Sequence, residues 1–177
     1  MGFSAIANDI QNKEIRQNLE QAISEAIMTV REVSNNLSPH ILNNFGLENA
    51  IRNFLGKIAI PKGFVVDYKM SIGDKRYTNT KEIVLYRVFC ELFNNTLRHA
   101  QATEIHFTLS EHDGIIALNY TDNGIGFNPT QRDDTTLGLG YYNIVSRVSS
   151  LKGQAKFSTL ENGSGLNVVI EIPADDK

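Results

Sequence analysis

One segment, Glu91–Ala100 (Glu-Leu-Phe-Asn-Asn-Thr-Leu-Arg-His-Ala), constrains the fold most because it carries two different faces at helical spacing. Each helical residue advances by about 100°, which places four polar residues on one side: Glu91, Asn95, Arg98 and His99. The other side is apolar and suited to burial: Leu92, Phe93, Leu97 and Ala100. The segment therefore predicts a helix that packs against a core and presents a polar stripe.

This stripe has the chemistry of a site for a hydrated metal ion and the phosphates that the ion bridges. Mg²⁺ prefers oxygen ligands and keeps several waters, so one or two protein ligands suffice. The Asn95 amide oxygen suits a direct ligand, and Glu91 could hold a metal-bound water or orient a proton transfer. Arg98 and His99 could neutralise phosphate charge. Taken alone, the stripe is more typical of a solvated helix face, and the neighbouring motifs favour the metal site.

The second motif, Asp122-Asn-Gly124-Ile-Gly126, follows directly after a predicted strand. A carboxylate only accepts hydrogen bonds, so Asp122 can receive the exocyclic amine of adenine and would repel the carbonyl of guanine. Gly124 and Gly126 let the backbone approach a flat ring and adopt positive φ. The alternative is an ordinary hairpin turn, because Asn-Gly is a common turn dipeptide.

A third motif, Gly138-Leu139-Gly140, precedes a helix predicted at 141–152. Backbone N–H groups at a helix N-terminus attract phosphate, although an ordinary helix entry fits as well. The motif is not a P-loop, because it lacks the GxxxxGK[ST] pattern. It is not a dinucleotide fingerprint either, because Asn143 occupies the position of the third glycine. Together the three motifs predict a nucleotide site.

Apolar spacing predicts the remaining elements. Residues 3–37 lack Gly and Pro and carry a helical seam of the coiled-coil or bundle kind, which Pro39 ends. A capping box at Asn79 and Glu82 opens the helix that runs to Ala100. The other predictions are a helix at 47–58, a loop at 128–136, a turn at 112–114, and strands at 64–70, 105–109, 116–120, 154–160 and 166–172.

These elements predict a two-layer α/β (α+β) sandwich, in which helices cover one face of a mixed, mostly antiparallel sheet, with an N-terminal helical arm. The net charge of −3 argues against nucleic acid as a partner. The lone Cys90 excludes an intrachain disulfide and is expected to be a small buried side chain. The chain shows neither a long apolar run nor a signal peptide, so we expect a cytoplasmic chain without membrane contact.

The order of the three motifs resembles the catalytic and ATP-binding domain of bacterial sensor histidine kinases. That domain belongs to the ATPase superfamily of gyrase, the ninety-kilodalton heat-shock chaperone and MutL. Residues 91–99 are similar to its N box, 122–126 to its first glycine box and 138–140 to its second. The resemblance covers about residues 47–173.

The resemblance implies a role for each motif residue. Asp122 would bind the adenine amine, Asn95 would ligate Mg²⁺, and Glu91 would organise metal-bound waters. Arg98 and His99 would meet the phosphates of ATP. The remaining nucleotide-binding positions would be Gly124, Gly126, Gly138, Leu139 and Gly140.

Residues 128–136 would form a short ATP lid. The chain departs from the family pattern at two positions. Tyr141 stands where leucine is common, and Leu166 stands where the family usually has threonine, so a hydroxyl near the adenine site is missing.

Upstream, residues 30–39 resemble the end of the dimerisation and phosphotransfer hairpin in the subfamily of nitrate-responsive and membrane-fluidity sensors. The phosphorylated histidine there lies in a His-Asp or His-Glu pair on the first helix, and residues 1–38 contain no such pair. We therefore expect residues 1–38 to be a remnant of that hairpin, through which a homodimer could form. Residues 39–177 would be the ATP-binding catalytic domain, unable to phosphorylate itself.

The expected function is ATP-dependent phosphoryl transfer to a histidine on a separate hairpin. In the parent kinase of this two-component phosphorelay, which could be membrane-anchored, the phosphate would pass to an aspartate of a response regulator. Two alternatives stay open: a degenerate, non-catalytic nucleotide-binding or dimerisation module, and a stand-alone ATPase or serine kinase of the same fold. Intact Glu91 and Asn95 argue against the first, and the helical arm argues against the second.

Overall fold

The computed structural model describes residues 39–59, 63–126, 138–160 and 163–175. Contacts divide the chain into two compact units, Met1–Pro39 and His40–Lys177, and all elements below except the first residue of α2 belong to the second unit. The helical seam predicted within residues 3–37 and the loop predicted at 128–136 lie outside the described residues.

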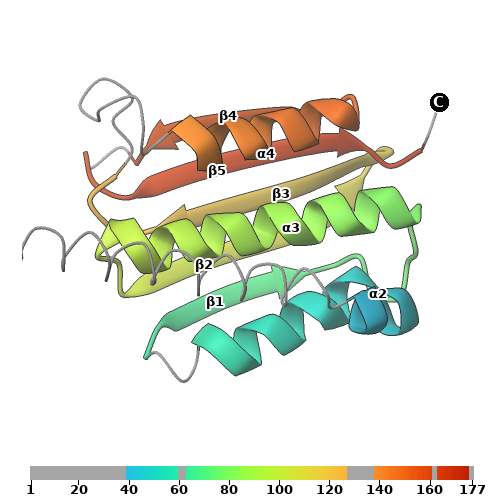
Figure 1. The fold of residues 1–177 in the computed structure, drawn as a ribbon, viewed down its shortest axis with the longest axis horizontal. Coiled ribbons are helices and arrows are strands. Elements are labelled where there is room, and N and C mark those ends of the chain that lie inside the picture. Colours follow the sequence, from blue (N-terminus) through green and yellow to red (C-terminus); the bar gives the residue numbers. More distant parts are fainter. Residues whose placement is uncertain (1–38, 60–62, 127–137, 161–162, 176–177) are drawn as a thin grey trace, which may run out of the picture. The chain divides into compact units, whose positions relative to one another are not determined.

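The described residues form a five-stranded sheet in the order β1-β2-β3-β5-β4 (Figure 1). Strand β1 pairs in parallel with β2, and the other three pairings are antiparallel. The prediction of a mixed, mostly antiparallel sheet is therefore confirmed. The strands span Val65–Met70 (β1), Glu104–His112 (β2), Ile115–Asp122 (β3), Gln154–Thr159 (β4) and Leu166–Pro173 (β5).

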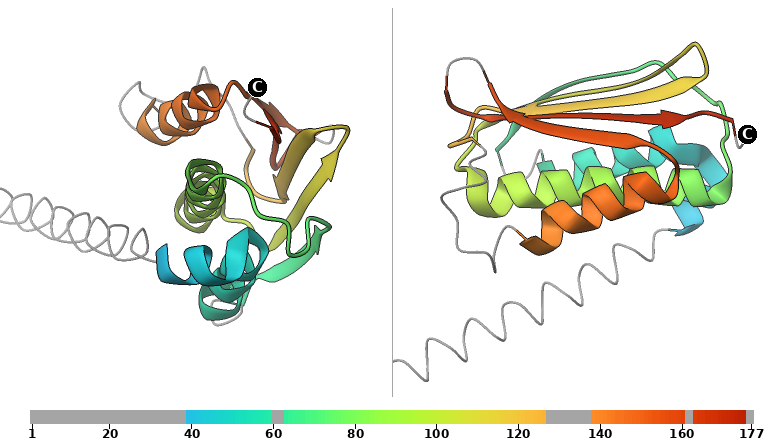
Figure 2. Two further views of the ribbon diagram at one scale, coloured as in Figure 1. Left: turned by 90° about the vertical axis from the view of Figure 1, so that its right-hand side faces the viewer. Right: turned by 90° about the horizontal axis from the view of Figure 1, so that it is seen from above.

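Helices cover one face of this sheet, as the side views in Figure 2 show. Helix α3, Asn79–Asn95, runs across the middle of the sheet and continues into the π-helical turn η3, Thr96–Ala100. Helix α4, Gly138–Ser150, packs against α3 and β4. Helix α2, Pro39–Phe54, continues into the π-helical turn η1, Leu55–Ala59. None of the described helices is long and apolar enough to cross a membrane.

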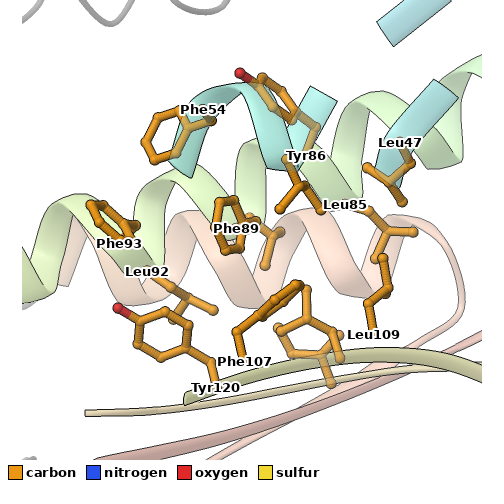
Figure 3. Close-up of a cluster of buried hydrophobic side chains, with 14 of the residues drawn as sticks. Leu47, Phe54, Leu85, Tyr86, Phe89, Leu92, Phe93, Phe107, Leu109 and Tyr120 are labelled. Carbon is orange, nitrogen blue, oxygen red and sulfur yellow. The ribbon is translucent and has the colours of Figure 1, made fainter. Parts of the chain in front are cut away.

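Aromatic and aliphatic side chains of α2, α3 and the sheet form one buried cluster (Figure 3). Phe89 and Phe93 of α3 are fully buried. The ring of Phe89 lies 4.7 Å from that of Phe107 on β2, and the ring of Phe93 lies 5.3 Å from that of Phe54 on α2. The predicted strand alternation places the inward residues of β2 and β3 in the same core: Ile105, Phe107, Leu109, Ile116, Leu118 and Tyr120.

The turn between β2 and β3 forms where Asp113-Gly114 predicted it. Both residues have positive φ, 50° and 75°, which two-residue hairpin turns of type I′ require. Cys90 is half-buried on α3, and burial raises the pKa of its thiol to about 12. The thiol is therefore protonated at neutral pH, as expected for an inert side chain.

The helix predicted at 47–58 is confirmed in its start, because Gly46, whose φ of 78° and ψ of 177° are not helical, forms a kink in α2 and helical geometry resumes at Leu47. The stretch from Pro39 to Phe45 before that kink is also helical and was not predicted. Proline fits the first turn of a helix because the N–H that it lacks would have no helical partner there.

The capping box predicted at Asn79 was wrong. Thr78 occupies the N-cap position and makes no side-chain cap hydrogen bond. The fully buried Glu82 instead accepts the Tyr77 backbone N–H at 3.0 Å and pairs with Arg76 at 2.8 Å. The Glu82 carboxylate therefore has an ionic partner outside its own helix.

The burial of Phe89 against Phe107 leads to a prediction about stability. Replacing Phe89 with alanine should lower the free energy of unfolding by about 3–5 kcal/mol, because Phe89 is fully buried between α3 and β2. Urea unfolding followed by circular dichroism measures this change. Phe45→Ala is the matched control, since 59% of Phe45 is exposed and the loss there should stay below about 1 kcal/mol. Equal losses in the two variants would contradict the assigned core.

Candidate functional site

The buried carboxylate of Asp122 lies at the end of β3, with 2% of the residue exposed. Its Oδ1 accepts the backbone N–H groups of Gly124 at 3.0 Å and Leu166 at 3.2 Å. Its Oδ2 accepts the Thr96 hydroxyl at 2.7 Å. The donors come from η3, from the turn after β3 and from the start of β5. The charge is therefore buried but hydrogen-bonded on both oxygens, which offsets the cost of burying it.

A carboxylate has about four acceptor positions. The two backbone N–H groups fill those of Oδ1, and the Thr96 hydroxyl takes one on Oδ2. Among the bonds that the described residues make, one acceptor position therefore remains on the Oδ2 atom of Asp122. It can receive a single N–H donor from a ligand, such as one hydrogen of an exocyclic amine.

A second buried hydroxyl stands behind this contact. Tyr120, two residues before Asp122 on the same side of β3, donates its phenol hydrogen to Thr96 Oγ1 at 2.8 Å. Burial raises the pKa of the Tyr120 phenol, so the phenol stays protonated and remains a donor. The result is a directed chain of hydrogen bonds from Tyr120 through Thr96 to Asp122.

Two glycines shape the turn after Asp122. A Cβ atom on Gly124 would collide with the Ala100 carbonyl, so only glycine allows the turn to lie against the end of η3. The next residue fixes that approach, because the Ile125 N–H donates to the Ala100 carbonyl at 2.9 Å. Gly126 has a φ of 84°, a region that favours glycine. The two glycines therefore let the turn after Asp122 pack closely against Ala100, Thr159 and Gly165.

The structure places Glu91 and Asn95 side by side against the first turn of α4. A Cβ atom on Gly140 would lie 2.9 Å from Glu91 Oε1 and 3.2 Å from Asn95 Nδ2. Both side chains are half-buried on α3. Gly140 therefore lets the start of α4 approach the two oxygen-bearing side chains of the stripe.

The basic end of the stripe lies in η3, where Arg98 and His99 are both exposed. The backbone of Gly138 and Leu139 lies in the first turn of α4. Two other histidines lie elsewhere on the sheet: His106 contacts Asp67 at 3.4 Å and His112 contacts Asp113 at 3.3 Å. The structure thus brings Glu91 and Asn95 together, whereas Arg98 and His99 are exposed side chains of η3.

The donor set around Asn95 fits a magnesium ion better than a protein-caged metal. Within the described ranges, no group of three or more His, Cys, Asp or Glu residues could hold a metal ion. Glu91 and Asn95 offer hard oxygen atoms, and Mg²⁺ takes its remaining ligands from water and phosphate.

Sequence reasoning missed three contributors: the hydroxyls of Thr96 and Tyr120, and the backbone N–H of Leu166. Strand periodicity could have found Tyr120, because it shares a strand face with Asp122. The contacts of Thr96 and Leu166 span 26 and 44 residues along the chain. No local pattern carries that information.

Comparison with curated proteins gives matches along most of the chain. The chain is 29% identical over 168 residues to the sensor histidine kinase ComP of Bacillus subtilis (strain 168). This match covers 93% of the chain and 21% of ComP. It is 30% identical over 161 residues to the signal transduction histidine-protein kinase/phosphatase DegS of Brevibacillus brevis, which covers 91% of this chain and 41% of DegS. The chain thus spans less than half the length of either relative.

Solved structures share the fold. The blue-light activated histidine kinase EL346 of Erythrobacter litoralis matches 87% of this chain and 50% of its own at a TM-score of 0.67, with 16% identity. The histidine kinase AdeS of Acinetobacter baumannii matches 90% of this chain and 84% of its own at a TM-score of 0.57, with 17% identity.

The sequence profile of a large ATPase family matches residues 80–176, which include α3, the turn after β3 and α4. This range contains Glu91, Asn95, Asp122 and Gly140. The chain belongs to the family of histidine kinase-, DNA gyrase B- and HSP90-like ATPases.

Proposed function

We propose that this chain binds ATP with Mg²⁺ and transfers the γ-phosphoryl group to a histidine on a separate helical hairpin. The observation that carries the proposal is the buried Asp122 carboxylate, which keeps one acceptor position and lies next to the helix that bears Glu91 and Asn95. Asp122 could bind the base while Glu91 and Asn95 bind the metal ion, so one nucleotide could contact both groups.

Asp122 would recognise the base. Its remaining acceptor position on Oδ2 suits the exocyclic amine of adenine, and the guanine carbonyl would face a negative charge there. Gly124 and Gly126 would present backbone without a Cβ atom to a flat ring beside this carboxylate. Selection of ATP over GTP therefore follows from one charged acceptor.

Asn95 would ligate Mg²⁺ through its amide oxygen, and Glu91 would hold a metal-bound water or orient the attacking histidine. The exposed Arg98 and His99 suit contact with phosphate oxygens, and the backbone of Gly138–Gly140 would add N–H donors at the start of α4. When bound, Mg²⁺ neutralises phosphate charge. Catalysis of this kind depends mainly on positioning and electrostatic stabilisation.

The proposed partners follow from the relatives. ComP and DegS are named as histidine kinases, and DegS also as a phosphatase. For this chain we propose residues 1–38 as the remnant of a dimerisation hairpin and 39–177 as the catalytic domain. The similarity to nitrate-responsive and membrane-fluidity sensors stays part of this proposal, as do a homodimer and a response regulator that receives the phosphate in the parent kinase.

Asp122→Asn should lower the affinity for ATP about 100-fold, roughly the loss of a hydrogen bond to a charged group. Oδ1 must keep accepting two backbone N–H groups, so the new amide would point its NH₂ group, a donor, at the adenine amine. Calorimetric titration with ATP and GTP measures the change. Asp113→Asn is the matched control, because 87% of that side chain is exposed in the β2–β3 turn. Unchanged ATP affinity in Asp122→Asn would refute the role in base recognition.

Asn95→Ala should abolish the gain in ATP affinity that Mg²⁺ provides while leaving binding of metal-free ATP within about threefold, because the base contact does not involve this side chain. Titrations with and without Mg²⁺ give both values. Asn119→Ala on β3 removes an amide that bonds to Thr108 instead, and it should keep the full magnesium effect. Persistence of the magnesium effect in Asn95→Ala would exclude Asn95 as the ligand.

Glu91→Gln should keep ATP affinity within about threefold and slow phosphoryl transfer about 100-fold, as expected when a group that assists proton transfer is removed. The assay follows acid-labile phosphate on the dimerisation hairpin of a sensor histidine kinase, supplied as a separate polypeptide. Asp113→Asn again serves as the control. ATP binding without any transfer by the unchanged chain would favour the non-catalytic module.

A further inference from the structure

The hydrogen-bond chain from Tyr120 through Thr96 to Asp122 has only one possible direction. The Asp122 carboxylate accepts and cannot donate, so the single Thr96 hydrogen is committed to it. Thr96 Oγ1 is then free only to accept, and Tyr120 must be its donor. Thr96 is 2% exposed and Tyr120 is fully buried, so water does not compete for either bond.

The position of Thr96 in the chain makes this contact more than a satisfied buried hydroxyl. Thr96 directly follows Asn95 and begins η3. Its backbone N–H bonds to the carbonyls of Leu92 and Phe93, which fixes the residue at the junction of α3 and η3. The hydroxyl therefore holds Asp122 Oδ2 from a rigid element.

We propose that Thr96, oriented by Tyr120, is a positioning residue that determines selectivity for the exocyclic amine of adenine. The Thr96 hydrogen occupies one side of Oδ2 and so aims the remaining acceptor position at the ligand. Without that hydrogen, Oδ2 has two vacant acceptor positions and no fixed direction. This inference rests on the proposed binding of ATP.

The experiment compares two nucleotides that differ only in the exocyclic amine, ATP and purine riboside triphosphate, by calorimetric titration with Mg²⁺. The unchanged chain should prefer ATP by about 10- to 100-fold. Thr96→Val keeps the shape of the side chain and removes its hydrogen. It should reduce ATP affinity about tenfold, leave affinity for the analogue within about twofold, and so collapse the preference.

Two variants and one control sharpen the test. Thr96→Ser restores a hydroxyl and should keep the preference within about threefold of the unchanged chain. Tyr120→Phe removes the donor behind Thr96 and should reduce the preference about threefold, less than Thr96→Val does. Thr108→Val is the matched control, because the Thr108 hydroxyl bonds to Asn119 and not to the site. Thermal unfolding tests whether each variant folds.

The outcomes separate the two proposals. No binding of either nucleotide by the unchanged chain would overturn ATP binding and this inference together. An undiminished preference for ATP in Thr96→Val would overturn the inference alone, as would an equal loss of affinity for both nucleotides, which is what a purely structural role predicts. If Thr96→Val fails to fold, an unchanged preference in Tyr120→Phe overturns the inference.

Discussion

The buried charge of Asp122 is the constraint on which the described domain depends. A carboxylate removed from water is tolerated only when donors meet it, and here they come from η3, from the turn after β3 and from the first residue of β5. The pairing of β3 with β5 makes this possible, because Thr121 lies opposite Asn167 and so brings the backbone of Leu166 to Asp122. The order of the strands in the sheet is therefore needed to supply a hydrogen-bond donor to the Asp122 carboxylate.

Periodicity predicted most of the described fold. Strands with alternating apolar residues, such as 105–109, were predicted correctly because each buries one face against helices. The helical stretch before the kink at Gly46 was not predicted, since Pro39 is compatible both with the end of one helix and with the first turn of the next. The partner of Glu82 was also missed, because Arg76 meets it through a turn that no helical pattern encodes.

The candidate site likewise contains features that the sequence predicted and features that it did not. Glu91 and Asn95 share a helix face by spacing alone, and their approach to Gly140 agrees with that spacing. Leu166 stands where the resembling family usually has a threonine hydroxyl. The structure places the Thr96 hydroxyl against the Asp122 carboxylate, and this contact depends on how α3 lies over the sheet. Such contacts between distant segments are fixed by tertiary packing and are not visible in local sequence.

The succession of Asn95 and Thr96 has a mechanical consequence. The two side chains leave the helix about 100° apart, one toward the start of α4 and the other toward the end of β3. Helix α3 therefore cannot rotate about its axis to improve one contact without disturbing the other. The aromatic packing of Phe89 and Phe93 opposes such a rotation as well. The core thus sets the angle at which the two halves of a bound nucleotide would be presented to each other.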